Sequence, residues 1–302
     1  MLEILTKAGC YVAIIVMGFV LRRRGFFGPE AFGVLSKVVL RITLPCAIIS
    51  SAAGQKLDAS MLVVFLIGLG TGVTYMIFGY CVARKGSRAE KAFYLLNIPG
   101  YSIGTFALPF TQNFLGSVGV LTTSIFDVGN AFVCLGGAFG VARAVKEGGK
   151  PDLKRLANAL LTSVPFMTHL VMVTLNLLRI RVPGPILTFT GIVGNANTFL
   201  AMLMLGVGFR LSAEREKLGA IVKVLSIRFG FAILLALCWY YLLPFDLLVR
   251  QTLVVLMFAP IGTAVPVFTR ELGEDEGLSS AINSVSIIIS IVIIVTLLTV
   301  ML

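Results

Sequence analysis

The stretch NIPGYSIGTFALPF, Asn97 to Phe110, lies within a long apolar segment, yet it contains two prolines, two glycines, an asparagine, a tyrosine, a serine and a threonine. A proline inside a helix removes one backbone hydrogen bond and crowds the preceding turn, which costs about 3 kcal/mol or more. In lipid, non-helical backbone persists only where protein or a water-filled cavity surrounds it. The stretch therefore predicts a broken helix. The rest of the sequence indicates the function of this break.

The composition of the chain is that of an integral membrane protein. Of the 302 residues, 58% are hydrophobic and only 13% are charged, whereas soluble domains carry about 25% charged residues. A net charge of +11 would suit nucleic acid, but the basic residues cluster at the ends of apolar segments, as membrane topology signals do. We therefore expect a lipid bilayer around the protein and no nucleic-acid partner.

Ten apolar segments are long enough to span a bilayer, which takes about 20 residues. They cover residues 4–21, 33–53, 60–83, 92–115, 118–142, 157–178, 186–208, 220–243, 248–268 and 279–301. The most polar loop, residues 143–155, divides them into five and five. Because five is odd, the second half enters the membrane with the opposite orientation, as in an inverted repeat. We expect an all-α membrane protein with one repeat at 1–142, a linker at 143–156 and an inverted repeat at 157–302.

Basic residues orient the chain in the membrane. Arg22, Arg23 and Arg24 follow the first segment, whereas the positive charge of a cleaved signal peptide precedes its apolar core. Placing these arginines in the cytoplasm puts sixteen Lys and Arg residues in inner loops and five in outer loops, a strong positive-inside bias. We expect a multi-pass protein of the cell membrane with both termini outside and the linker in the cytoplasm.

The second half carries a matching interruption, FAPIGTAVPVF at 258–268, with two prolines around a glycine and a threonine. Alone, each proline could equally kink a continuous helix. Interrupted segments at corresponding positions of two halves, however, are the best sequence pointer to a transporter binding site, and the positive ends of half-helices favour anions. The candidate substrate-binding residues are Ser102, Gly104, Thr105, Pro109, Asn130, Pro260, Gly262, Thr263 and Pro266.

Asp127 is the only acid placed deep within an apolar segment, where an ionised Asp costs about 2.5–3.5 kcal/mol on insertion scales. Asn130, three residues on, lies near the same helix face. Two interpretations stay open for Asp127: an ion-coupling site for a proton or cation, or a structural carboxyl capped by backbone groups at the break. His169 is interpreted as a packed side chain. Arg228 is placed near the inner end of the eighth segment, so we expect no cation at the midplane.

The polar residues of the last segment and the cysteines are interpreted as structural. Asn283, Ser286 and Ser290 form one helical stripe, which favours contacts between helices. The five cysteines fall within apolar segments, which indicates small buried side chains and neither disulfides nor a metal site.

The residue inventory argues against an enzyme. An intramembrane aspartyl protease needs two buried acids, and a zinc protease needs a motif such as H-E-x-x-H, whereas this chain has one deep acid and one histidine. No phosphate-binding GK[ST] loop is present either. We expect no catalytic residues, no cofactor and no metal, and transport driven by a gradient rather than by ATP.

Four motifs resemble those of the auxin efflux carrier family, in its bacterial branch, within the bile-acid/sodium-symporter-like superfamily. They are TLPCAIISS at 43–51, GYSIGTFALPF at 100–110, FDVGNA at 126–131, and APIGTAVPVF at 259–268 followed by TRELG. The resemblance implies ten transmembrane helices in two inverted five-helix repeats, with broken fourth and ninth helices that cross near the bilayer midplane. Many relatives carry asparagine at the position of Ser102 and near Ala264. This difference from the family pattern concerns the identity of the substrate and not the fold.

The resemblance also implies the kind of substrate, because members of the family move organic anions. We expect a secondary transporter of a small organic anion, a mono- or dicarboxylate, that works by alternating access with H+ or Na+ as the coupling ion. A channel for ions or solutes, and a non-transporting membrane sensor on the same fold, remain the alternatives. The sequence leaves both a monomer and a homodimer open.

Overall fold

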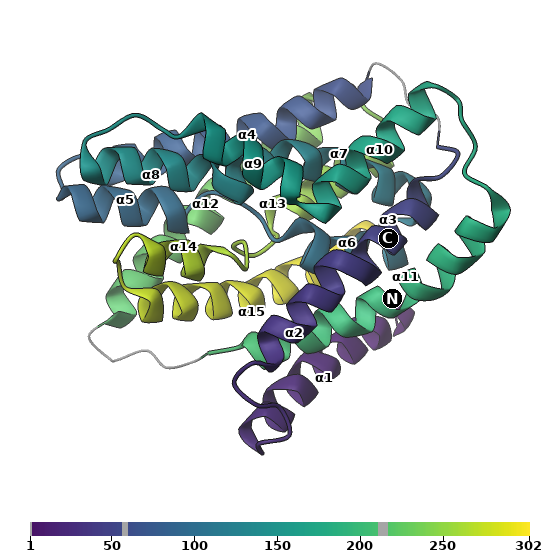
Figure 1. Ribbon diagram of the computed structural model, residues 1–302, viewed down its shortest axis with the longest axis horizontal. Coiled ribbons are helices and arrows are strands. Elements are labelled where there is room, and N and C mark those ends of the chain that lie inside the picture. Colours follow the sequence, from purple (N-terminus) through teal and green to yellow (C-terminus); the bar gives the residue numbers. More distant parts are fainter. Residues whose placement is uncertain (1, 56–59, 211–216) are drawn as a thin grey trace.

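The computed structural model describes residues 2–55, 60–210 and 217–302, and these residues form helices and no strand (Figure 1). The helices of the first half are α1 (Leu2–Arg23), α2 (Ala31–Val38), η1 (Val39–Thr43), α3 (Leu44–Ala52), α4 (Ser60–Val82), α5 (Arg88–Asn97), η2 (Ile103–Ala107), α6 (Leu108–Phe114), α7 (Gly116–Phe132), η3 (Val133–Gly137) and α8 (Ala138–Glu147). The η elements are single π-helical turns: η1 and η3 each join two α-helices, and η2 leads from non-helical chain into α6.

The helices of the second half are α9 (Leu153–Thr162), α10 (Val164–Leu177), α11 (Gly184–Gly208), α12 (Leu218–Leu242), α13 (Leu247–Met257), α14 (Val265–Glu271) and α15 (Glu276–Met301). The sixth predicted segment, 157–178, is bent by 74° between α9 and α10, where Ser163 caps the second helix and Pro165 lies in its first turn. A proline is tolerated in that turn because its missing N–H would be unpaired there anyway.

Each of the ten apolar segments corresponds to one helix or to helices joined at a break. Within the described residues, seven helices are long and apolar enough to cross a membrane, or eight if the bent pair α9–α10 counts as one span. The two segments outside that count are the ones predicted to be broken, α5–α6 and α13–α14, whose helices are individually too short. Long apolar helices in this number indicate a multi-pass membrane protein.

Both predicted breaks are present in the structure. Between α5 and η2 the chain leaves the helix over residues 98–102, which include Pro99 and Gly100, the latter at φ +80°. A positive φ strains any residue with a Cβ, so glycine suits this position. Between α13 and α14, residues 258–264 are non-helical and include Pro260. The prolines thus accompany true interruptions instead of kinking continuous helices.

The contacts between helices repeat from one half to the other. In the first half α4 packs on α5 and α7, and α6 packs on α7; in the second half α12 packs on α13 and α15, and α14 packs on α15. The halves meet where α11 lies against α1 and α3, and where α10 lies against α3. The crossing of α4 and α7 is close, since a Cβ on Gly129 would overlap the carbonyl oxygen of Phe65. Small residues of this kind let membrane helices approach closely.

The linker and the two chain ends lie in different parts of the molecule. The α8–α9 connection lies at the left of Figure 1, whereas the ends marked N and C lie near each other towards the right. The linker is tied to the connection between α14 and α15, because Arg155 pairs with Glu271 at 2.7 Å and Lys146 pairs with Glu274 at 2.5 Å. The linker and the α14–α15 connection therefore lie at the same end of the helix bundle.

Candidate functional site

The two interrupted segments meet through their backbones. The N–H of Ser102 donates a hydrogen bond of 2.9 Å to the carbonyl oxygen of Pro260. Backbone groups freed by a break need partners when they are buried away from water. Here part of that need is met by the other break, which ties the two interruptions together.

A polar side chain from the following long helix supports each break. Asn130 of α7 accepts from the N–H of Tyr101 and donates to its carbonyl, both at 3.1 Å. Asn283 of α15 donates to the carbonyls of Ile261 and Gly262 at 3.0 and 3.2 Å. The Ser286 hydroxyl accepts from the N–H of Ile261 at 3.2 Å and donates to the carbonyl of Asn283. Asn283 and Ser286, interpreted from the sequence as contacts between helices, thus hold the second break.

Arg228 lies in the middle of α12, at the crossing of the two breaks, so its placement near the end of the eighth segment is wrong. The residue is only 1% exposed. Its guanidinium donates to the carbonyls of Ile98, Gly100 (2.9 Å) and Ala259 (3.0 Å). It also lies over the rings of Tyr101 and Tyr75, with 4.8 and 5.6 Å from Cζ to the ring centroids.

The charge of Arg228 is matched by helix dipoles. The carbonyls it binds follow the C-terminal ends of α5 and α13, and each helix C-terminus carries the equivalent of roughly half a negative charge. No acidic side chain pairs with Arg228 among the described residues. The C-terminal ends of α5 and α13 and two aromatic faces therefore stabilise this buried cation. The guanidinium in turn neutralises the partial negative charge of the two helix ends.

A pocket opens beside this crossing, with an empty volume of about 820 Å³ that includes space open to the surroundings. Of the predicted site residues it is lined by Ser102, Gly104, Thr105, Asp127, Asn130, Gly262 and Thr263. Pro109, Pro260 and Pro266 are outside the lining: Pro109 lies in the first turn of α6, Pro260 accepts the bond from Ser102, and Pro266 lines a second cavity.

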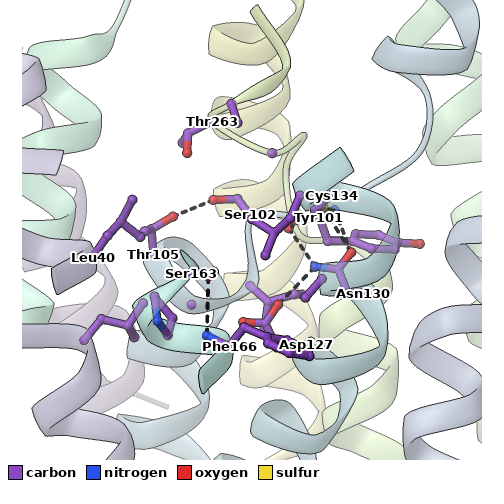
Figure 2. A pocket seen from close by; sticks show the side chains of 18 of the residues that line it. Leu40, Tyr101, Ser102, Thr105, Asp127, Asn130, Cys134, Ser163, Phe166 and Thr263 are labelled. Carbon is purple, nitrogen blue, oxygen red and sulfur yellow. Dashed lines mark hydrogen bonds between the residues drawn. The ribbon is translucent and has the colours of Figure 1, made fainter. Parts of the chain in front are cut away.

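Hydroxyl groups and an apolar wall give the pocket two kinds of surface. The hydroxyls of Ser102 and Thr105 are 2.7 Å apart and hydrogen bonded, and Figure 2 shows Thr263 beyond them. The Thr263 hydroxyl has no partner within the described part of the chain, so a ligand can use it. Leu40 and Phe166 contribute apolar surface from η1 and α10. The pocket therefore suits a small molecule with one polar end.

Asp127 lies in the pocket beside two polar neighbours. One carboxylate oxygen accepts from the Asn130 amide at 3.0 Å, as Figure 2 shows. The other lies 3.9 Å from Nε2 of His169, whose side chain is 5% exposed against 19% for Asp127. Because both donors of the Asn130 amide are used by Tyr101 and Asp127, this amide serves the protein before any ligand.

Sequence reasoning missed two residues of this site. His169 is buried as expected, but the bend between α9 and α10 carries it to the wall beside Asp127. No sequence pattern indicated that bend. Arg228 could have been found, because it lies ten residues beyond the start of a 25-residue helix. At about 1.5 Å per residue this is roughly half the thickness of a bilayer core.

One comparison with known proteins gave a match, which covers the first half of the chain. Residues 10–148 match the family model described as "Membrane transport protein". The matched part contains the first break, the pocket residues of α7 and the start of the linker. A search of curated proteins gave no match. Over residues 10–148, slightly less than half of its length, the chain is therefore similar to a family of membrane transport proteins.

Proposed function

We propose that the protein is a secondary transporter that carries a small organic anion, a mono- or dicarboxylate, by alternating access. The observation that carries this proposal is the pocket at the crossing of two broken helices, joined by the bond from Ser102 to Pro260. Broken helices near the midplane are where secondary transporters bind their substrates. The membrane transport family of residues 10–148 agrees with a transport function.

An inverted repeat of five and five helices supports alternating access. The contacts of α4 with α5 and α7 correspond to those of α12 with α13 and α15. When the fourth and ninth segments are taken as equivalent, the first segment (α1) matches the sixth (α9–α10), and the second (α2–α3) matches the seventh (α11). The contacts of α1 with α11 then correspond to those of α10 with α3. On this proposal the chain has ten membrane segments, with a first repeat at 1–142 and a second at 157–302. Rocking of one part against another would then open the pocket to either side.

The charges around the crossing favour an anion. Arg228 neutralises the C-terminal ends of α5 and α13, which would otherwise repel a carboxylate. The opposite, positive ends of the half-helices begin at Ile103 and Val265, and both residues line the pocket. The hydroxyls of Ser102, Thr105 and Thr263 add donors. Helix ends are worth up to about 2 kcal/mol each when partly buried, so we expect modest affinity.

The coupling ion is assigned to Asp127 on this proposal. Its carboxylate is the acidic group in the pocket, and His169 is its nearest basic neighbour. A proton or a sodium ion bound there would sit beside the substrate and change the charge of the site. An intramembrane acid is by default a functional candidate because its burial is costly.

The membrane orientation follows from the same proposal. The linker, α14 and the end of α1 would face the cytoplasm of a cell, and both termini would lie outside. The ion pairs from Arg155 to Glu271 and from Lys146 to Glu274 support a common side for the linker and the α14–α15 connection. The excess of Lys and Arg in the loops on that side supports its assignment to the cytoplasm.

Counterflow in proteoliposomes separates the proposal from its alternatives. Vesicles loaded with an unlabelled carboxylate should take up the same labelled carboxylate transiently above equilibrium, with saturable kinetics. Unit conductance steps in a planar bilayer would instead assign a channel. Binding of a carboxylate without any flux would assign a membrane sensor, and neither outcome is compatible with a carrier.

A further inference from the structure

A second cavity lies on the other side of the segment that follows the second break. Its empty volume is about 900 Å³, including space open to the surroundings. Thr263 lines both cavities, whereas Gly262 lines only the first and Pro266 only the second. The short segment around Thr263 is therefore the wall between the two.

Three arginines from separate parts of the chain line this second cavity. Arg22 comes from the last turn of α1, Arg210 follows α11, and Arg270 lies in the last turn of α14. One acid, Glu276, is also in the lining, and its carboxylate lies 3.7 Å from Arg270. Three arginines against one glutamate leave the lining with a net charge of +2.

Neutral hydrogen bonds hold the guanidinium of Arg22 and only the backbone of Arg210. A guanidinium nitrogen of Arg22 donates to the carbonyl of Val207 at 2.7 Å, and the backbone N–H of Arg210 donates to the Ser284 hydroxyl at 3.0 Å. Neither arginine is paired with an acid in the ranges that the structure describes. Arginine presents a planar fork of donors that matches a carboxylate, so these guanidinium groups suit an anion in the cavity.

The polar wall of this cavity is bonded to the second break. Asn283 lines the second cavity and donates to the carbonyls of Ile261 and Gly262 in the break. The positive-inside rule explains why these loops are basic, but it does not require that their arginines line one cavity. Arg24, two residues after Arg22, is outside the lining.

We propose that the arginine-lined cavity is a second binding site for a small carboxylate anion, on the cytoplasmic side of Thr263. This inference rests on the proposed function: the anion waits here before it enters the first pocket or after it leaves. A charged cleft with low-dielectric walls raises the local concentration of an oppositely charged solute by about tenfold or more. The cavity would therefore compensate for the modest affinity of a pocket that holds its anion by helix ends and hydroxyls.

A charge-selective cysteine probe tests the cavity without knowledge of the substrate. Ser280, which lines it and is half-buried, is replaced by cysteine in a chain whose five native cysteines are changed to alanine. The rates of modification by anionic sulfonatoethyl and cationic trimethylammonioethyl methanethiosulfonate are each divided by the rate with free mercaptoethanol. We expect the anionic reagent to be favoured by about tenfold or more. We also expect succinate, but not its dimethyl ester, to slow the reaction.

Charge variants complete the test. Arg210→Gln with Arg270→Gln should abolish the preference for the anionic reagent, and Arg24→Gln is the matched control that should leave it unchanged. No preference in the starting chain, or an equal loss in Arg24→Gln, would overturn the second site. Anion preference with succinate protection but no carboxylate transport would instead remove the proposed function and leave this site standing.

Discussion

The N–H of Ser102 lies 2.9 Å from the carbonyl oxygen of Pro260, although the two residues belong to different halves of the chain. This bond joins two segments that are each interrupted by proline. Around it, Asn130 and Asn283 bind backbone groups of Tyr101, Ile261 and Gly262, and Arg228 binds the carbonyls that end α5 and α13. Side chains from α7, α12 and α15 thus support both interruptions.

Replacing Pro260 with alanine should abolish transport while the protein still inserts into the membrane. Alanine restores an N–H and permits α13 to extend, which would close off backbone groups that now face the crossing. We expect counterflow to fall by about tenfold or more, since a small displacement of positioning groups can cost about a hundredfold. Pro183→Ala, at the exposed start of α11, is the matched control. Full activity of Pro260→Ala would reduce the proline to an incidental kink.

Replacing Arg228 with glutamine should destabilise the protein strongly. The carbonyls of Ile98, Gly100 and Ala259 would lose their charged donor, and each buried acceptor left without a partner costs about 1–3 kcal/mol. Arg228→Lys keeps the positive charge but not the planar set of guanidinium donors, so its stability should lie between those of the wild type and Arg228→Gln. Lys223→Gln, on the exposed part of the same helix, loses only a contact with the Tyr94 ring and should change stability by about 1 kcal/mol or less. Thermal unfolding in detergent measures all three, and equal stability of Arg228→Gln and Lys223→Gln would contradict the assigned role.

Replacing Asp127 with asparagine should uncouple transport from its driving gradient. The variant keeps the shape of the side chain and a partner for Asn130, but it cannot bind a proton or a cation in the same way. We expect exchange of labelled for unlabelled carboxylate to continue, with accumulation no longer driven by a pH or sodium gradient. Asp246→Asn, at the exposed start of α13, should keep the dependence. A variant that loses stability but keeps gradient-driven uptake would make Asp127 a structural residue.

Replacing Gly129 with alanine should separate α7 from α4. The added Cβ would overlap the backbone of Phe65, and overpacking of this kind typically costs about 1–3 kcal/mol. Because α7 carries Asp127 and Asn130, binding of a carboxylate should weaken as well. Gly70→Ala, whose added Cβ would meet nothing within 4 Å, is the matched control. Similar folded yields and melting temperatures for the two variants would show that the crossing tolerates a wider spacing.

Local chemistry explains why much of the fold could be predicted from the sequence. The apolar segments are about 20 residues long, and Pro and Gly mark the breaks at 98–102 and 258–264, so hydropathy and backbone rules suffice for both. The bend at Ser163 has no comparable signal, because Pro165 lies where a proline also fits an ordinary helix start. Local rules describe one segment at a time, and the bend depends on packing against other segments.

The candidate site was predictable only in part, for the same reason. Ser102 and Thr263 lie in the breaks, Thr105 lies in the η2 turn that follows the first break, and all three line the pocket. Arg228 and His169 reach the site from α12 and α10, which approach it only after the helices have packed. Asn130 was expected to serve the substrate, yet its amide supports the backbone of Tyr101. Which polar group binds backbone and which binds ligand depends on distances that the sequence does not contain.

Competition between an acid and its uncharged derivatives tests the central claim most directly. Uptake of labelled succinate into proteoliposomes is measured with unlabelled succinate, dimethyl succinate or succinamide added outside, and the same series is repeated with a monocarboxylate. An anion carrier whose site combines half-helix ends with hydroxyl donors should be inhibited by the free acid and not by the ester or the amide. Equal inhibition by the neutral ester, or by an organic cation, would contradict the assignment of an anion to the crossing.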